Sequence, residues 1–330
     1  MKTIFLNPGD SFQDALDEAA KSKCKSRIIL CDGEYAGAKK ARLFYDSPFP
    51  LEIIGSGAKN CSLKGENCEA FHKDTENRAI LTFGEKCTRV FLSNFEIENA
   101  HVKTKDDYAL GNQAEALCWH NQTGFLKCEK MRFKSRQDTI HVKGFSFFSE
   151  CEILGDVDFI WGYCDTAFFE NCKITTIRDN RGGNRPAFVL QSRAKNARPG
   201  FVFSCCDFFA EERADGGEIF IGRSAGTGAK DSVDRWDSIA LLDCTLDENY
   251  SKELWTDENG TRSVFPQKGT ANCGWREWKT RFVQKDGSIF PLDASKQEKH
   301  GQSLSKDETD FLLRTVSQIL LEKEKSVSEE

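Results

Sequence analysis

Two aspartates stand in an otherwise apolar stretch, GDVDFIWG, at residues 155–162. Asp156 and Asp158 alternate with Val157 and Phe159, which predicts a β-strand with both carboxylates on one face and apolar side chains on the other. A lone aspartate on an exposed strand is usually solvated. A chemical role for either carboxylate therefore requires a partner elsewhere in the chain.

A second carboxylate and two amides recur upstream at similar spacing. Asp138 stands 20 residues before Asp158 and next to Gln137, and Gln113 stands 24 residues before Gln137. If a structural repeat takes about 21 residues, these side chains form a column across strands about 4.8 Å apart. Two carboxylates this close cannot both ionise easily, so the pKa of one should rise while that of the other stays low, as acid–base or nucleophilic chemistry requires. The two amides could donate N–H hydrogen bonds to an oxyanion. A solvated polar ridge is the alternative.

The repeat length comes from a phrase that recurs along the chain. In six short segments, a Cys, Met or Phe is followed two residues later by an apolar residue. The aligned Cys, Met or Phe positions are Phe95, Met131, Cys151, Cys172, Cys206 and Cys244. Two successive gaps of 20 and 21 residues, with short strands and frequent turns between them, predict a parallel β-helix. Reduced cysteine packs as a small hydrophobe, so these positions would form an interior ladder that accounts for 14 cysteines without disulfides.

Amphipathic helices are predicted at both ends of the chain. Residues 11–22 and 305–323 each begin with an N-cap serine and carry an apolar stripe, and Ser305 begins a capping box. These short helices are expected to cap the solenoid at its N- and C-terminal ends. The expected organisation is one β-helix esterase domain over residues 1–302, followed by a helix in residues 303–330 that packs on the solenoid and ends in a frayed tail.

Composition excludes several classes of function. The net charge of −6 gives no sign of a basic patch that would bind a nucleic acid. No apolar run approaches the length of a membrane span. The five histidines do not have the spacing of metal ligands. We therefore expect no nucleic-acid partner, no membrane span and no metal. The apolar run in the first residues, MKTIFLNPGD, is too short to be the apolar region of a secretory signal. Together with the free cysteines this favours a cytoplasmic location, and secretion with removal of a signal is the alternative.

Four motifs together resemble the signature blocks of the pectin methylesterase family in order and spacing. They are QAEAL, RQDT, GDVDFIWG and FIGR. The stretches SFQDALDEA, DGEY and LEIIGSG resemble the opening of that family and GWREW its closing block, so the resemblance covers roughly residues 3–280. It implies an all-β, right-handed parallel β-helix that hydrolyses methyl esters of galacturonate. It also implies no cofactor, and a methyl-esterified galacturonan or oligogalacturonide as substrate. We expect the protein to be a monomer.

The same resemblance implies a role for each polar residue of the column. Asp158 would be the nucleophile, and Asp138 the general acid that later acts as base. Gln137 and Gln113 would stabilise the oxyanion, and Arg223 would hold Asp158 ionised and oriented. No family role falls on Asp156, which is interpreted as structural or solvated.

Substrate contacts are expected from Gln113, Arg223 and Trp161. Trp161 stands where the family usually has Phe, so it either supplies an aromatic platform or packs in the core. His141 replaces the usual Tyr, and it could simply face solvent. Ser224 and Ala225 replace a Pro-Trp pair whose Trp lines the sugar site. This last departure leads us to expect short oligosaccharide substrates.

Three other functions are compatible with parts of the sequence. GRSAG, residues 222–226, matches the G-x-S-x-G motif of serine hydrolases, but a poor helix start follows it and we treat the match as chance. A β-helix pectate lyase or galacturonan hydrolase is the enzymatic alternative. Such lyases bind calcium through clustered acids, whereas amides flank the carboxylates here. A non-catalytic carbohydrate-binding solenoid is the third possibility, and the presence of all five expected site residues argues against it.

Overall fold

The fold is taken from a computed structural model that describes most of the chain. The described residues are 1–37, 39–103, 112–179, 181, 185–194, 197–211, 217–224, 237–257, 274–293 and 301–326. The predictions that concern Ala225, the end of GRSAG and the last four residues lie outside these ranges.

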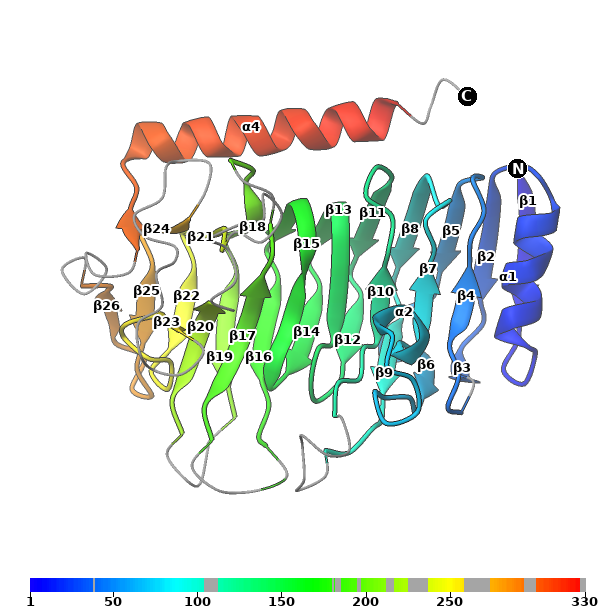
Figure 1. Ribbon diagram of the computed structural model, residues 1–330, viewed down its shortest axis with the longest axis horizontal. Helices are drawn as coiled ribbons and strands as arrows, with labels where there is room; N and C mark the ends of the chain where they lie inside the picture. The colour runs from blue at the N-terminus through cyan, green and yellow to red at the C-terminus, as the bar shows by residue number, and fades with distance from the viewer. Residues whose placement is uncertain are drawn as a thin grey trace.

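The chain forms a right-handed parallel β-helix, which confirms the predicted fold class (Figure 1). Three faces of stacked strands run along the solenoid. The first face contains β1 (Lys2–Leu6), β2 (Ser26–Leu30), β5 (Leu51–Ile54), β8 (Arg89–Ser93), β11 (Phe125–Glu129), β13 (Ile140–Ser149), β15 (Val157–Glu170), β18 (Gly200–Ser204), β21 (Ile239–Leu242), β24 (Trp275–Trp278) and β27 (Gln302–Ser303). The second face contains β4 (Leu43–Tyr45), β7 (Leu81–Phe83), β10 (Leu117–Trp119), the first halves of β13 and β15, β17 (Ala187–Ser192), β20 (Ile219–Ser224) and β23 (Trp255–Asp257).

The third face is a separate sheet. It contains β3 (Gly33–Ala36), β6 (Cys61–Gly65), β9 (Glu96–Asn99), β12 (Arg132–Lys134), β14 (Glu152–Gly155), β16 (Lys173–Thr176), β19 (Asp207–Ala210), β22 (Thr245–Asp247), β25 (Arg281–Val283) and β26 (Ile289–Pro291). Among the described strands every ladder is parallel except the one between β25 and β26. The first and second faces join because β13 and β15, with 10 and 14 residues, bend across both.

The predicted interior ladder is present, and a recurring turn builds it. The residues just before its six members all have positive φ: Asn94, Lys130, Glu150, Asn171, Cys205 and Asp243. The six ladder residues themselves are at most 2% exposed. The thiols of the four cysteines among them donate to carbonyls of the preceding coil, for example from Cys172 Sγ to Phe148 O at 3.4 Å and from Cys206 Sγ to Phe169 O at 3.4 Å. The left-handed residue turns the chain sharply, so the next side chain points into the core.

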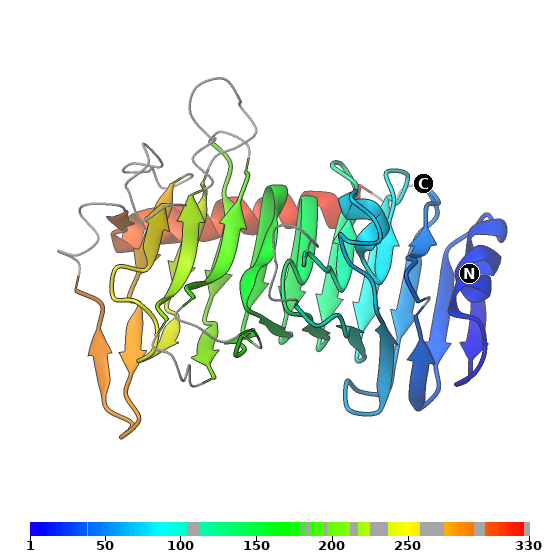
Figure 2. The same cartoon turned by 60° about the horizontal axis from the view of Figure 1, so that its bottom comes forward.

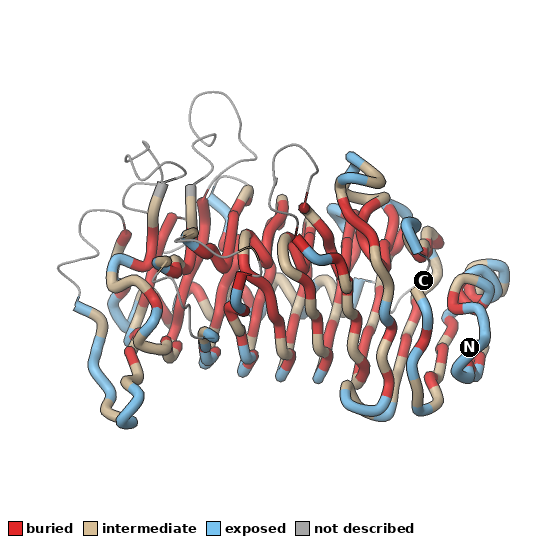
Figure 3. Tube along the Cα trace, turned by 90° about the horizontal axis from the view of Figure 1, so that it is seen from below, coloured by how far each residue is buried: buried red, intermediate tan, exposed pale blue. Residues whose placement is uncertain are grey.

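Two longer helices cover the solenoid at different places. α1 (Phe12–Lys21) closes the N-terminal coil behind the N-cap Ser11 and buries Phe12 and Leu16. Its outer surface is exposed, while buried positions continue through the coils that follow (Figure 3).

α4 (Lys306–Lys325) lies along the side of the solenoid and spans several coils (Figures 1 and 2). The expectation of a short cap on the C-terminal end is therefore wrong, since this helix has 20 residues and packs on the side. Its capping box joins Ser305 to Glu308, and Leu312 and Val316 are buried on it. These two residues pack in one apolar cluster with outward-facing residues of the first face, Phe168, Val202, Ala240 and Leu242. Among the helices of the described residues, none has the length and apolar character needed to cross a membrane.

Thiol reactivity provides a test of the ladder. The 13 cysteines within the described residues are all free, Cys205 is exposed, and Cys172 is 2% exposed. We expect Cys205→Ser to remove one fast-reacting thiol from the native protein, and Cys172→Ser to leave the fast phase unchanged. Titration with a chromogenic disulfide reagent measures both variants. In denaturant, most of the 14 thiols of the sequence should react. A fast phase lost in Cys172→Ser, or six or more disulfide bridges, would contradict this structure.

Candidate active site

Three carboxylates lie side by side on the second face because consecutive strands are in register. Ile140 pairs with Leu117 on the preceding strand and with Ile160 on the following strand. Glu115, Asp138 and Asp158 each lie two residues before one of these paired residues, so they occupy matching positions on successive coils. The backbone N–H of Asp138 also donates to Val157 O at 3.1 Å. The period of the solenoid therefore places one carboxyl group above another, about one strand spacing apart. We call these three residues the carboxylate column.

Asp158 is held by an arginine from two coils further on. Arg223 on β20 donates from Nε to Asp158 Oδ1 at 2.9 Å and from Nη2 to Asp158 Oδ2. The Arg223 guanidinium also lies 4.8 Å from the ring centre of Phe188. This paired geometry fixes the orientation of the Asp158 carboxylate.

Asp138 shares a second arginine with Glu115. Arg78, from α2 (Thr75–Arg78), donates from Nη2 to Asp138 Oδ2 at 3.2 Å. Its Nε and Nη2 atoms contact Glu115 at 2.7–2.9 Å. Arg78 and Glu115 were not among the residues expected from the sequence. Glu115 could have been found, because it lies in QAEAL at the position that matches Asp138 and Asp158 one and two coils later.

Burial shifts the protonation of all three members of the column: at Glu115 it raises the pKa, while Arg78 opposes the rise through its charge and its hydrogen bonds. Burial raises the pKa of Asp138 well above its ordinary value, and the charge of Glu115 raises it further while Arg78 opposes the rise. Burial also raises the pKa of Asp158, but here Arg223 opposes the rise through both its charge and its hydrogen bonds. Asp138 receives one hydrogen bond from an arginine and Asp158 receives two. Asp138 is therefore the carboxyl group better able to keep a proton.

Both aspartates adopt a backbone conformation that is unusual outside glycine. The φ angles of Asp138 and Asp158 are 59° and 47°. Such left-handed residues cost on the order of 1–3 kcal/mol each. In this chain they also occur at the turns that precede the ladder residues, so the conformation alone does not mark a functional position. At Asp158 the register with β17 also shifts, between Val157 and Ile160.

This conformation overturns the expectation that Asp156 and Asp158 point to the same face. Asp156 is fully buried, and its Oδ2 accepts from Lys103 Nζ at 2.8 Å. The left-handed Asp158 interrupts the alternation of the strand, so only Asp158 opens to the cavity described below. Asp156 is thus structural, and the alternative that it is solvated is wrong.

A cavity of about 570 Å³ lies over the column. Asp138, Asp158, Gln113, Arg223 and Trp161 all line it, so the structure brings five of the expected site residues together. Gln137 is half-buried and is not part of this lining; its backbone pairs with Val157.

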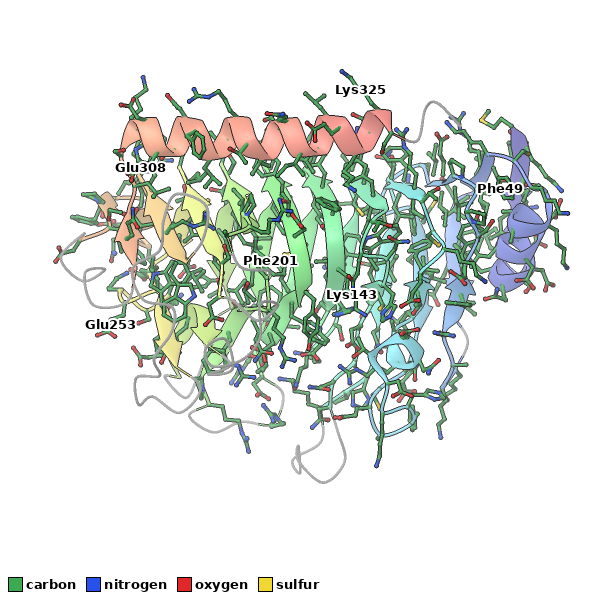
Figure 4. The ribbon with its side chains drawn as sticks, turned by 45° about the horizontal axis from the view of Figure 1, so that its top comes forward. Phe49, Lys143, Phe201, Glu253, Glu308 and Lys325 are labelled. Atoms are coloured by element: carbon green, nitrogen blue, oxygen red, sulfur yellow. The ribbon has the colours of Figure 1, made fainter. Side chains whose placement is uncertain are left out.

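A larger cavity of about 820 Å³ shares no residue with this one. In Figure 4, Phe49 of the larger cavity lies at the N-terminal coils, whereas Lys143 of the smaller cavity lies at the central coils. The chemistry-bearing side chains belong to the smaller cavity. Within the ranges that the structure describes, no group of three or more His, Cys, Asp or Glu residues could hold a metal ion.

Trp161 and His141 form one unit in the cavity wall. Their ring centres are 4.3 Å apart, and Trp161 is 8% exposed. His141 is 1% exposed, which is incompatible with the suggestion that it faces solvent. Its Nδ1 atom lies 3.3 Å from Cys118 Sγ, and burial lowers its pKa well below the ordinary value. A neutral His141 therefore packs against Trp161, and Trp161 lines the cavity. The expectation of short substrates stays a prediction, since Ala225 lies outside the described residues.

Comparisons with known proteins show which family the sequence resembles. The family model described as Pectinesterase matches residues 10–225. The "Pectinesterase A" of Emericella nidulans is 27% identical over 191 residues, which cover 57% of this chain and 55% of that protein. The "Putative pectinesterase 14" of Arabidopsis thaliana is 27% identical over 220 residues, which cover 64% of this chain and 60% of that protein. The matched part of the chain thus spans less than two thirds of these curated relatives.

Solved structures show the same fold over nearly the whole chain. The pectin methylesterase from carrot superposes with a TM-score of 0.70 at 15% identity, covering 98% of this chain and 96% of that one. The deglycosylated pectin methylesterase from Aspergillus niger superposes with a TM-score of 0.66 at 18% identity, covering 96% and 95%.

The buried pair below the column can be tested by stability. Lys103 and Asp156 are both fully buried, so Lys103→Met leaves Asp156 without its cation and should lower the free energy of unfolding by about 3–5 kcal/mol. The double variant Lys103→Met with Asp156→Leu should recover most of that loss. Urea denaturation measures both. Lys64→Met, which removes a lysine that is 44% exposed and paired with Glu98, is the control. A loss at Lys103 as small as at Lys64 would show that Asp156 does not depend on this cation.

Proposed function

The chain belongs to the pectinesterase family, and from this premise we propose that it is a carboxylic ester hydrolase that removes methyl esters from galacturonate units of pectin or of its oligosaccharides. The observation that carries the proposal is the pair of neighbouring carboxyl groups beneath the cavity. Asp158 is oriented by Arg223, while Asp138 beside it is poised to keep a proton. A nucleophile and an acid of the same chemical type thus differ through their partners.

In the proposed acylation step, an Asp158 carboxylate oxygen attacks the ester carbonyl carbon. The carbonyl oxygen takes up the negative charge, and then the bond between carbonyl carbon and methoxy oxygen breaks. Asp138 gives its proton to the leaving methoxy oxygen, so methanol departs and an acyl-enzyme anhydride remains.

In the proposed deacylation step, Asp138 is a carboxylate and acts as base. It takes a proton from a water molecule, whose oxygen attacks the galacturonyl carbonyl carbon. The anhydride bond breaks, Asp158 leaves as a carboxylate, and Asp138 has regained its proton. The products are one methanol and one galacturonic acid unit, which loses its own proton to water and becomes galacturonate. The two aspartates account for the other proton transfers without a metal.

Amide donors and an aromatic edge complete the proposed site. Gln113, which lines the cavity, would donate to the oxyanion, with Gln137 of the next coil as the second donor. Trp161 would contact the sugar, with Gln113 and Arg223 beside it. The protein is proposed to act as a monomer.

Methanol release from methylated pectin tests the function and the roles. We expect Asp158→Ala to abolish release, and Asp138→Asn to do nearly as much. Asp207→Asn, on the exposed third face, is the control and should keep full activity. Gln137→Ala should lower kcat about a hundredfold with a smaller change in KM. Wild-type activity in Asp158→Ala would remove the nucleophile assignment.

The same assay separates the esterase from a lyase. An esterase releases methanol with or without chelator and produces no unsaturated sugar. Chelator-sensitive absorbance from an unsaturated product, without methanol, would instead assign a pectate lyase. Binding without either product would assign a carbohydrate-binding solenoid.

A further inference from the structure

A buried ion pair touches the proposed acid, and the reaction described above does not use it. The side chains of Arg78 and Glu115 are 4% and 0% exposed, and three contacts of 2.7–2.9 Å join them. The same Arg78 Nη2 atom that contacts Glu115 also reaches Asp138 Oδ2 at 3.2 Å. Arg78 therefore bridges two neighbouring members of the carboxylate column.

Stability alone gives little reason for such a pair. Removing two charges from water costs several kcal/mol per ion, and apolar residues of similar volume often stabilise a protein equally well or better. The pair is instead placed where its charge acts on one particular carboxyl group. The charged groups that act on Asp138 are Glu115 before β10, Arg78 on α2, Asp158 on β15 and Arg223 on β20.

The column has one more carboxyl group than the guanidiniums that contact it, so one carboxyl group is expected to stay protonated. Three carboxyl groups, Glu115, Asp138 and Asp158, are contacted by two guanidiniums, Arg78 and Arg223. The charges of Arg193 and Lys103 add to that of Arg223 in favouring ionised Asp158. Arg223 serves Asp158, and Arg78 directs three of its four contacts in the column to Glu115. The middle carboxyl group, Asp138, is left without a cation of its own and has an acidic neighbour on each side. Because Asp138 Oδ2 accepts from Arg78, the proton belongs on Oδ1.

We propose that Arg78 and Glu115 are a positioning pair for Asp138, in which Glu115 neutralises the guanidinium that reaches Asp138 so that Asp138 remains the protonated member of the column. Arg78 orients the Asp138 carboxyl group through one hydrogen bond, while Glu115 prevents the arginine from ionising it. The catalytic consequence rests on the proposed function, whereas the protonation itself does not.

The count predicts a different number of protons for each variant. Glu115→Gln leaves two carboxyl groups and two guanidiniums, so no protonated carboxyl group remains in the column. Arg78→Met leaves three carboxyl groups and one guanidinium, so two are protonated. The double variant Arg78→Met with Glu115→Leu leaves two and one, which restores the wild-type number of one.

Difference infrared spectroscopy near neutral pH measures this number in the full-length protein. The C=O stretching band of a protonated carboxyl group should be lost in Glu115→Gln, as it is in the reference variant Asp138→Asn. It should gain intensity in Arg78→Met and return to the wild-type level in the double variant. A Glu115→Gln band equal to wild type would overturn the proposal. If Glu115→Gln fails to fold, an unchanged band in Arg78→Met would overturn it equally.

The pH profile of methanol release tests the catalytic consequence. General acid catalysis requires protonated Asp138, so activity falls as pH rises through its pKa. In Glu115→Gln this limb should move to lower pH by about 1–3 units, because Arg78 then acts on Asp138 unopposed. The double variant should return it towards wild type, and a role confined to stability would leave it in place in both variants. If the infrared bands change as expected but the wild-type protein releases no methanol, the proposed function is refuted and the positioning pair is still supported.

Discussion

Close stacking of carboxyl groups is the constraint around which this site is organised. In a parallel solenoid, residues in register on successive coils are held about 4.8 Å apart, and no side-chain rotation can separate them fully. Glu115, Asp138 and Asp158 occupy such positions. Each carboxyl group must therefore find a cation or keep a proton. The two arginines that reach the column divide it into two compensated carboxylates and one acid.

The backbone and the burial around the column follow from that division. Asp138 and Asp158 adopt left-handed φ angles, which bring their carboxyl groups to the cavity rather than into the regular alternation of the strand. Asp156, two residues from Asp158, shows the contrasting outcome. It remains in the interior, where Lys103 compensates it. Two aspartates in one short stretch thus differ in chemistry because of backbone conformation and partner, not because of residue type.

The sequence predicted the features that repeat along the chain. The ladder of Cys, Met and Phe and the spacing of Asp138 from Asp158 both follow from a coil of about 21 residues, so the β-helix could be inferred before the structure. Arg78 could not be inferred in this way. It arrives from α2, which lies between the strands β6 and β7 of successive coils and has no place in the repeat. The burial of Asp156 and His141 was also missed, because period-two alternation does not anticipate a left-handed residue or a tightly packed wall.

Neutron diffraction from a crystal of the unliganded protein near neutral pD tests the central claim most directly. The account predicts one deuteron in the column, on Asp138 Oδ1, with Glu115 and Asp158 both ionised. A deuteron on Asp158 or Glu115, or an ionised Asp138, would contradict it.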